Sequence, residues 1–198
     1  MPRALVFENE EFLISGGDDK CLIKYSILEK EISLKKIVEG RIVSMAIDGK
    51  RGVLFVAQSN NTVTLHAVAS LGKISQFSEN FDISCITFIG PDNIAVGGTE
   101  GELRLYDARN TREAISASKL IEGGGKINQI LGLDLRNIVA LTDKLQIMDT
   151  SLKVVETLNM ENRSEGSLRK VVFDKKRMLL VVGGFDGKIH LIKICKLN

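Results

Sequence analysis

The chain has 198 residues, of which 44% are hydrophobic and 26% charged, a composition that excludes a disordered or low-complexity protein. Its 27 basic and 25 acidic residues leave a net charge of +2, so we do not expect the concentrated basic face typical of nucleic-acid-binding proteins. No stretch approaches the ~18 apolar residues of a membrane-spanning helix, and the first residues contain no apolar run long enough for a signal peptide.

The cysteines indicate a reducing compartment. Cys21, Cys85 and Cys195 are odd in number and widely spaced, and each lies within an apolar run. This pattern favours buried thiols over disulfides. We therefore expect a cytoplasmic or nuclear protein that does not contact a membrane.

Short apolar runs rich in valine, isoleucine and leucine follow one another along the chain, and turn residues interrupt them every eight to twelve positions. This spacing predicts the strands of an all-β meander, and helical spacing never extends beyond about two turns. The predicted strands form four groups of four: 4–8, 12–17, 21–27 and 31–37; 42–48, 52–59, 62–68 and 72–78; 83–89, 93–98, 102–108 and 114–120; 127–133, 137–142, 145–150 and 154–160. The last group has only three strands: 168–174, 178–184 and 188–194.

The third strand of each group ends at an equivalent position, and these positions are 41, 40, 42 and 44 residues apart: Tyr25, His66, Tyr106, Met148 and Ile192. A fixed period in this range is typical of propellers, solenoids and arrays. We therefore expect a single domain over 1–198. Its repeat units would lie at about 1–40, 41–80, 81–124, 125–166 and 167–198.

Some predicted strands are apolar on both faces, and 178–184 (MLLVVGG) is the clearest case. Sheets that are covered on both faces, as stacked blades are, would explain such a run. Glycine pairs end the second strand in three units, at Gly16-Gly17, Gly97-Gly98 and Gly183-Gly184. We expect glycine at these points to permit a close approach of neighbouring backbone.

The order of strand, Gly-Gly, Asp-Gly-type turn, strand and aromatic-Asp resembles the WD40 repeat. The best copy is 99–108 (TEGELRLYDA), with Tyr106-Asp107 at the Trp-Asp position, and 185–194 keeps the Asp186-Gly187 turn. The resemblance implies an all-β propeller of four-stranded antiparallel blades, with five blades visible and the last lacking its fourth strand. The sequence departs from the family because it has no tryptophan and no Gly-His opening a repeat. The Asp-His-Ser-Trp hydrogen-bond network of the family therefore cannot be complete, and we expect apolar packing to hold the blades.

The repeat is compatible with three assemblies: a five-bladed ring, a fragment of a larger propeller, or an array completed by another chain. An array that does not close would expose sheet edges, which can pair with a partner.

Loops form the binding surface of a propeller, because its strands are buried by packing between the blades. The connections that enter each first strand are expected on one face of the disc, with these residues as candidates for partner binding: Arg3, Arg41, Phe81, Asp82, Lys126 and Arg163. Mixed charge beside an exposed aromatic suits a protein or peptide partner. The alternative is that each is an ordinary solvated loop residue.

The sequence shows no catalytic or metal-binding pattern. His66 and His190 both lie in third strands, and His66 takes the position of the blade aromatic, which favours a structural role. No cysteine or histidine pair has metal-ligand spacing. The run 122–126 (EGGGK) is no phosphate loop, since Ile127 stands where Ser or Thr would bind magnesium and a strand follows. We expect no enzymatic activity, no metal and no cofactor.

The resemblance implies a non-enzymatic scaffold that mediates protein–protein interactions in an intracellular complex. The alternative is an RNA-associated propeller in ribosome assembly or RNA processing, which would use the basic patch Arg169, Lys170, Lys175, Lys176 and Arg177. A solvated strand pair and turn would account for the same patch. A propeller hydrolase is a third alternative, for which no acid pair can be assigned.

Overall fold

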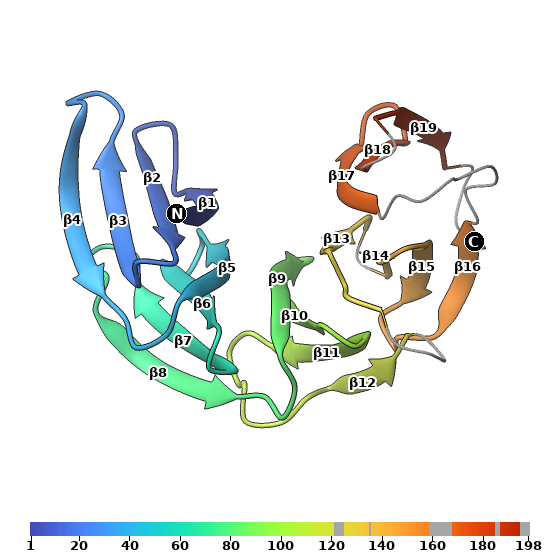
Figure 1. Ribbon diagram of the computed structural model, residues 1–198, viewed down its shortest axis with the longest axis horizontal. Coiled ribbons are helices and arrows are strands. Elements are labelled where there is room, and N and C mark those ends of the chain that lie inside the picture. The colour runs from blue at the N-terminus through green and yellow to red at the C-terminus, as the bar shows by residue number, and fades with distance from the viewer. Residues whose placement is uncertain (121–124, 135, 159–167, 185–186, 195–198) are drawn as a thin grey trace. The chain divides into compact units, whose positions relative to one another are not determined.

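The computed structural model describes residues 1–120, 125–134, 136–158, 168–184 and 187–194. The chain divides into two compact units, Met1–Ile86 and Thr87–Asn198. The described residues form strands and connecting turns, as the apolar runs predict (Figure 1). None of the described residues belongs to a helix long and apolar enough to cross a membrane.

The first unit holds two complete sheets of four antiparallel strands. Sheet 1 runs in chain order through β1 (Pro2–Phe7), β2 (Phe12–Gly17), β3 (Cys21–Ser26) and β4 (Glu31–Ile37). Sheet 2 repeats this order with β5 (Ile42–Asp48), β6 (Val53–Gln58), β7 (Thr62–Ala67) and β8 (Lys73–Ser78). Sequential pairing of neighbours makes each sheet a meander, so each strand pairs with the next one along the chain.

Sheet 3 begins with β9 (Ile83–Ile89), which starts in the first unit, and continues with β10 (Asn93–Gly98), β11 (Glu102–Asp107) and β12 (Ser116–Lys119). Sheet 4 consists of β13 (Gln129–Gly132), β14 (Asn137–Leu141), β15 (Leu145–Asp149) and β16 (Val154–Leu158). Sheet 5 has three strands among the described residues: β17 (Leu168–Asp174), β18 (Leu179–Gly184) and β19 (Ile189–Lys193). The predicted strands, their grouping and their all-β class are confirmed, and the strand bounds agree within two residues at each end among the described residues.

Acidic side chains close the turns between first and second strands. Asp48 Oδ1 accepts hydrogen bonds from the backbone N–H groups of Lys50 and Arg51, both at 3.1 Å. Asp174 makes the same pair of bonds in sheet 5, at 3.0 and 3.1 Å. Each of these two carboxylates therefore stabilises its own turn. Burial by itself would raise the pKa of Asp48, but hydrogen bonds from the Arg51 side chain and from backbone hold the pKa below its ordinary value.

The two faces of each sheet have different neighbours. Face a of each sheet is the face that carries the equivalent third-strand residue of the repeat, and face b is the opposite face. In sheets 1 to 5 these residues are Tyr25, His66, Tyr106, Met148 and Ile192. In the first unit, Ile14 and Leu22 on face b of sheet 1 pack with Leu54 and Val56 on face a of sheet 2. In the second unit, face b of sheet 4 packs in the same way on face a of sheet 5. Both junctions therefore join face b of one sheet to face a of the next.

A hydrogen-bonded tie from a first strand to the first strand of the next sheet occurs twice, once between sheets 2 and 3 and once between sheets 4 and 5. In the first unit, the Ile86 N–H donates to Ser44 Oγ at 3.2 Å. In the second unit, Gln129 accepts from the Val171 N–H at 2.9 Å and donates to the Val171 carbonyl at 3.0 Å. Each tie links a first strand to backbone 42 residues later. The repeat therefore positions polar contacts as well as apolar ones.

The glycine pairs behave differently at the two ends of the chain. A Cβ added to Gly17 would lie 2.8 Å from Pro2 Cα, so the expected close approach of neighbouring backbone is confirmed there. A Cβ on Gly183 would meet nothing within 4 Å, so the prediction is wrong at that position. The expectation that 178–184 is covered on both faces also fails among the described residues. Leu180 and Val182 are fully buried on face a, whereas Leu179 and Val181 on face b are only half-buried and lie beside the exposed Val172 and Leu191 of β17 and β19.

Candidate functional site

The six residues predicted to form a loop surface have different surroundings. Arg41 and Asp82 are exposed just before β5 and β9, and Lys126 is exposed in the second unit. Arg3 is also exposed but lies within β1, where its Nε donates to both carboxylate oxygens of Asp18 at 3.1 Å. Arg163 lies outside the described residues.

Phe81 corrects the prediction of an exposed aromatic, because only 8% of its surface is accessible. Ile83 and Cys85 follow it at intervals of two and are also buried. Alternation of this kind marks one face of a strand, and here it extends the buried face back into the connection before β9. The sequence contained this signal, but the interpretation of 81–82 as a loop obscured it.

Sheet 2 contains a chain of buried hydrogen bonds that begins at His66. His66 Nδ1 lies 3.0 Å from the carbonyl oxygen of Leu71, and Nε2 lies 2.9 Å from Thr64 Oγ1. Gln58 Nε2 donates to the same Oγ1 at 2.9 Å, and Gln58 Oε1 accepts from the Gly40 N–H at 2.6 Å. The chain links the β7–β8 turn to the connection that enters β5.

The direction of every bond in this chain follows from its two ends. A carbonyl oxygen only accepts, so His66 Nδ1 carries the proton and Nε2 of the neutral ring accepts from the Thr64 hydroxyl. The same hydroxyl then accepts from the Gln58 amide. Both nitrogens of His66 are therefore occupied, and the imidazole has no lone pair available to act as a base toward a substrate.

The surroundings of His66 stabilise its neutral form. Burial lowers the pKa of His66 most, and the positive charges of Lys73 and Lys36 lower it further, against an opposing effect of the hydrogen bond to Leu71. We conclude that His66 has a structural role at the position where the WD40 pattern has an aromatic.

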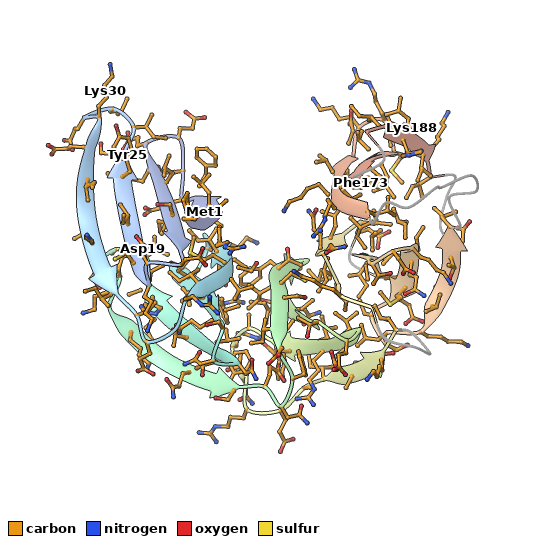
Figure 2. All side chains as sticks on the ribbon, viewed as in Figure 1. Met1, Asp19, Tyr25, Lys30, Phe173 and Lys188 are labelled. Carbon is orange, nitrogen blue, oxygen red and sulfur yellow. The ribbon has the colours of Figure 1, made fainter. Side chains whose placement is uncertain are left out.

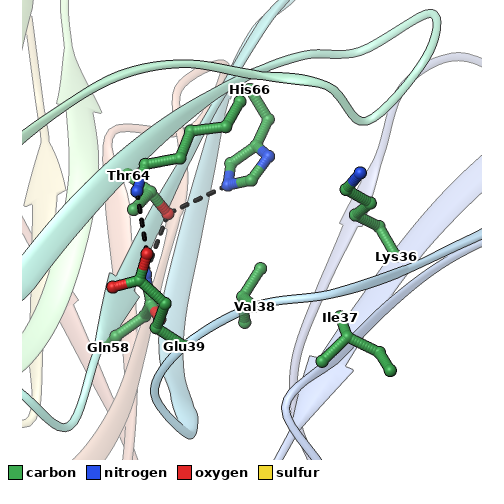
Figure 3. A pocket seen from close by; sticks show the side chains of 8 residues that line it. Lys36, Ile37, Val38, Glu39, Gln58, Thr64 and His66 are labelled. Atoms are coloured by element: carbon green, nitrogen blue, oxygen red, sulfur yellow. Dashed lines mark hydrogen bonds and ion pairs between the residues drawn. The ribbon is translucent and has the colours of Figure 1, made fainter.

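A cavity of about 260 Å³ lies beside this hydrogen-bonded chain in the first unit (Figure 3). Its lining consists of Lys36, Ile37, Val38, Glu39, Gln58, Thr64, His66 and Lys73. Lys73 Nζ donates to Glu39 Oε1 at 3.1 Å, so a cation and an anion of the lining neutralise each other. Because the polar groups at its base already bond one another, this cavity offers a ligand few free contacts.

A wider depression, of about 610 Å³, lies in the second unit where first strands turn into second strands. Its lining comes from sheets 3, 4 and 5 and consists of Phe88, Gly90, Leu131, Gly132, Leu133, Asp134, Phe173 and Lys175. Figure 2 shows Phe173 on β17. Phe88, Leu131 and Phe173 are half-buried, so each presents part of an apolar surface to the depression.

The charged side chains that line the depression, Asp134 and Lys175, differ in their hydrogen bonding and exposure. Asp134 Oδ1 accepts from the backbone N–H groups of Arg136 and Asn137, at 2.7 and 2.8 Å. Burial by itself would raise the pKa of Asp134, but these and other hydrogen bonds hold the pKa below its ordinary value. Lys175, by contrast, is an exposed cation at the edge of the lining. The depression therefore combines partly exposed aromatic rings with one accessible positive charge.

The sequence interpretation missed this depression because it considered only the connections entering first strands, and the depression lies at the opposite ends of those strands. One sequence signal was available. Phe88 and Phe173 occupy equivalent positions in units three and five, 85 residues apart.

No three histidine, cysteine, aspartate or glutamate residues within the described ranges gather to hold a metal ion. Residues 122–124 of the glycine-rich run lie outside those ranges. No family model matches the sequence, and a search of curated proteins finds no match either.

Proposed function

We propose that the five repeated sheets are blades of a divergent WD40-like β-propeller, and that the protein acts as a non-enzymatic scaffold for protein–protein interactions. Five sheets of three or four antiparallel strands, with the same order and the same junctions, support the architecture. Cys21 and Cys85 are buried thiols, which supports a reducing compartment such as the cytoplasm or nucleus.

The depression in the second unit is the observation that carries this proposal. Partly exposed aromatic and aliphatic side chains in a concave site are typical anchors for a protein partner. Phe88 and Phe173 would take up an apolar side chain of that partner, and Lys175 would attract an acidic residue next to it. The proposed partner segment is thus a short peptide with an apolar anchor flanked by negative charge.

Capture from cell extract with the wild-type chain and with Lys175→Glu tests the proposal. Lys144→Glu is the matched control, since Lys144 is an exposed turn lysine of the same unit that does not line the depression. We expect a partner whose purified form binds Lys175→Glu about tenfold more weakly or worse, while Lys144→Glu binds like wild type. Partners that bind all three chains equally would contradict this site.

RNA binding is a second candidate, supported by the exposure of Lys170, Lys175 and Lys176 on β17 and the turn after it. Arg177 of the same patch is engaged by Asp174, with Nη1 at 2.7 Å from Oδ2. Binding dominated by phosphate contacts falls steeply as salt rises. Retention of a mixed-sequence RNA that does not change with salt, or no retention at all, would reject this candidate.

A further inference from the structure

Face b of sheet 5 has the apolar composition of a packed junction, but no described strand covers it. Ile189 is 74% exposed and Leu191 is 66% exposed, and both lie on this face of β19. Their counterparts in sheet 4 are Leu145 and Ile147, at most 1% exposed because sheet 5 covers them. Equivalent positions of one repeat thus differ in whether another described sheet covers them.

Face a of sheet 1 shows the complementary situation. Leu5 is 55% exposed and Phe7 is 58% exposed on β1, and Ile32 on β4 is also exposed. Figure 2 shows Tyr25 of the same face on β3. Met45 in sheet 2 is equivalent to Leu5 and is buried in the junction with sheet 1. Sheet 1 therefore carries the face that a preceding sheet normally covers.

The hydrogen-bonded ties between neighbouring sheets have equivalent positions on these two exposed faces. Ser44 and Gln129 reach backbone at Ile86 and Val171 in the next sheet. The equivalent residue in sheet 5 is Lys170, which is exposed on face b and can donate to a carbonyl. The equivalent backbone in sheet 1 is that of Leu5, which follows from the shared pairing of β1 and β5 with their neighbours.

We propose that this chain associates with a second copy of itself, with face b of sheet 5 in one copy packing on face a of sheet 1 in the other. The junctions between sheets 1 and 2 and between sheets 4 and 5 each join a face b to a face a, and among the described residues face b of sheet 5 and face a of sheet 1 carry exposed apolar side chains. Each uncovered face lies within a single unit, so the interface needs only residues of one unit from each copy. The contact is heterologous, and such contacts extend head to tail unless they close into a ring. This inference is independent of the depression and its partner.

Sedimentation velocity of the full chain over a wide concentration range tests this proposal, with two variants that place a charge on one face each. Leu191→Glu alters sheet 5 and Phe7→Glu alters sheet 1, while Ile74→Glu on β8 is the control, since Ile74 is equally exposed but lies on neither face. We expect wild type and Ile74→Glu to associate as concentration rises. Each face variant should associate at least about tenfold more weakly, because its glutamate must be buried at the contact.

A mixture of the two variants distinguishes the head-to-tail contact from other modes of association. The Phe7→Glu chain retains an intact sheet 5 and the Leu191→Glu chain an intact sheet 1, so we expect a one-to-one pair that grows no further. A monomeric wild type, a mixture that stays monomeric, or association sensitive to only one of the two variants would overturn the proposal. Circular dichroism confirms that each variant is folded, and if a glutamate unfolds the chain, Phe7→Ser and Leu191→Ser replace the pair in the same scheme.

Discussion

Thr64→Val tests whether the buried hydrogen-bond chain of sheet 2 stabilises the fold. Valine has nearly the shape of threonine but lacks the hydroxyl that joins His66 Nε2 to Gln58 Nε2, each 2.9 Å away. Thr64 and His66 are 2% exposed and Gln58 is fully buried, so these side chains depend on one another for hydrogen bonds.

The expected loss of stability can be worked from this geometry. Two buried polar groups lose a partner, and each such loss costs about 1–3 kcal/mol. The additional methyl group of valine recovers about 0.8 kcal/mol by apolar burial. We therefore expect Thr64→Val to lower the free energy of unfolding by about 3 kcal/mol. Thr64→Ser keeps the hydroxyl and should lose only about 1 kcal/mol, for the missing methyl group.

Urea denaturation followed by far-ultraviolet circular dichroism measures these differences, because the chain has no tryptophan to report by fluorescence. Thr157→Val is the control, since Thr157 is exposed on β16 and its change should stay within about 0.5 kcal/mol. If Thr64→Val is as stable as Thr64→Ser, the hydrogen-bond chain does not stabilise the protein and the reasoning is refuted.

Three further predictions concern single contacts. Burial, together with the charges of Lys73 and Lys36, lowers the pKa of His66 in the folded state, so the unfolded chain binds the proton first. Stability is therefore complete above about pH 6.5 and falls below it, by at most about 1.4 kcal/mol per pH unit. His66→Gln should flatten this slope in denaturation curves. The buried Lys24 Nζ lies 2.6 Å from Glu8 Oε2. Glu8→Ala leaves the Lys24 charge uncompensated and should lower the free energy of unfolding by about 2–3 kcal/mol, which is more than Lys24→Met should lower it. The opposite order of the two variants in thermal unfolding would contradict this prediction. Gln129→Leu removes the tie from β13 to β17 and should accelerate hydrogen exchange of the bonded amide on β17, while an unchanged exchange rate would show that the tie contributes nothing.

Most strand positions could be predicted from the sequence, because a strand and its turn are encoded within about ten residues. Asp48 and Asp174 illustrate this, since each carboxylate bonds backbone only two and three residues ahead. The equivalence of Tyr25 and His66 also follows from spacing alone, and the pairing of Leu13 with Tyr25 and of Leu54 with His66 agrees with it.

The role of His66 could be predicted only in outline. Its position in the repeat favoured a structural role, but its partners Gln58 and Thr64 form no recognisable motif with it. The Leu71 carbonyl accepts from His66 because Leu71 has a φ of 54°, a left-handed conformation that leucine rarely adopts and that no local residue preference indicates. The position of His66 in the repeat therefore favoured a structural role, whereas the structure identifies which atoms bond its ring nitrogens.

The sequence by itself determined the period of the repeat, the strands and the alternation of side chains between faces, because these depend on neighbours along the chain. It could not determine which faces are covered. Leu145 and Ile189 are both apolar at equivalent positions, yet one is fully buried and the other is 74% exposed. Burial of that kind depends on whether a sheet about forty residues away packs on the face, and only the tertiary structure decides that contact.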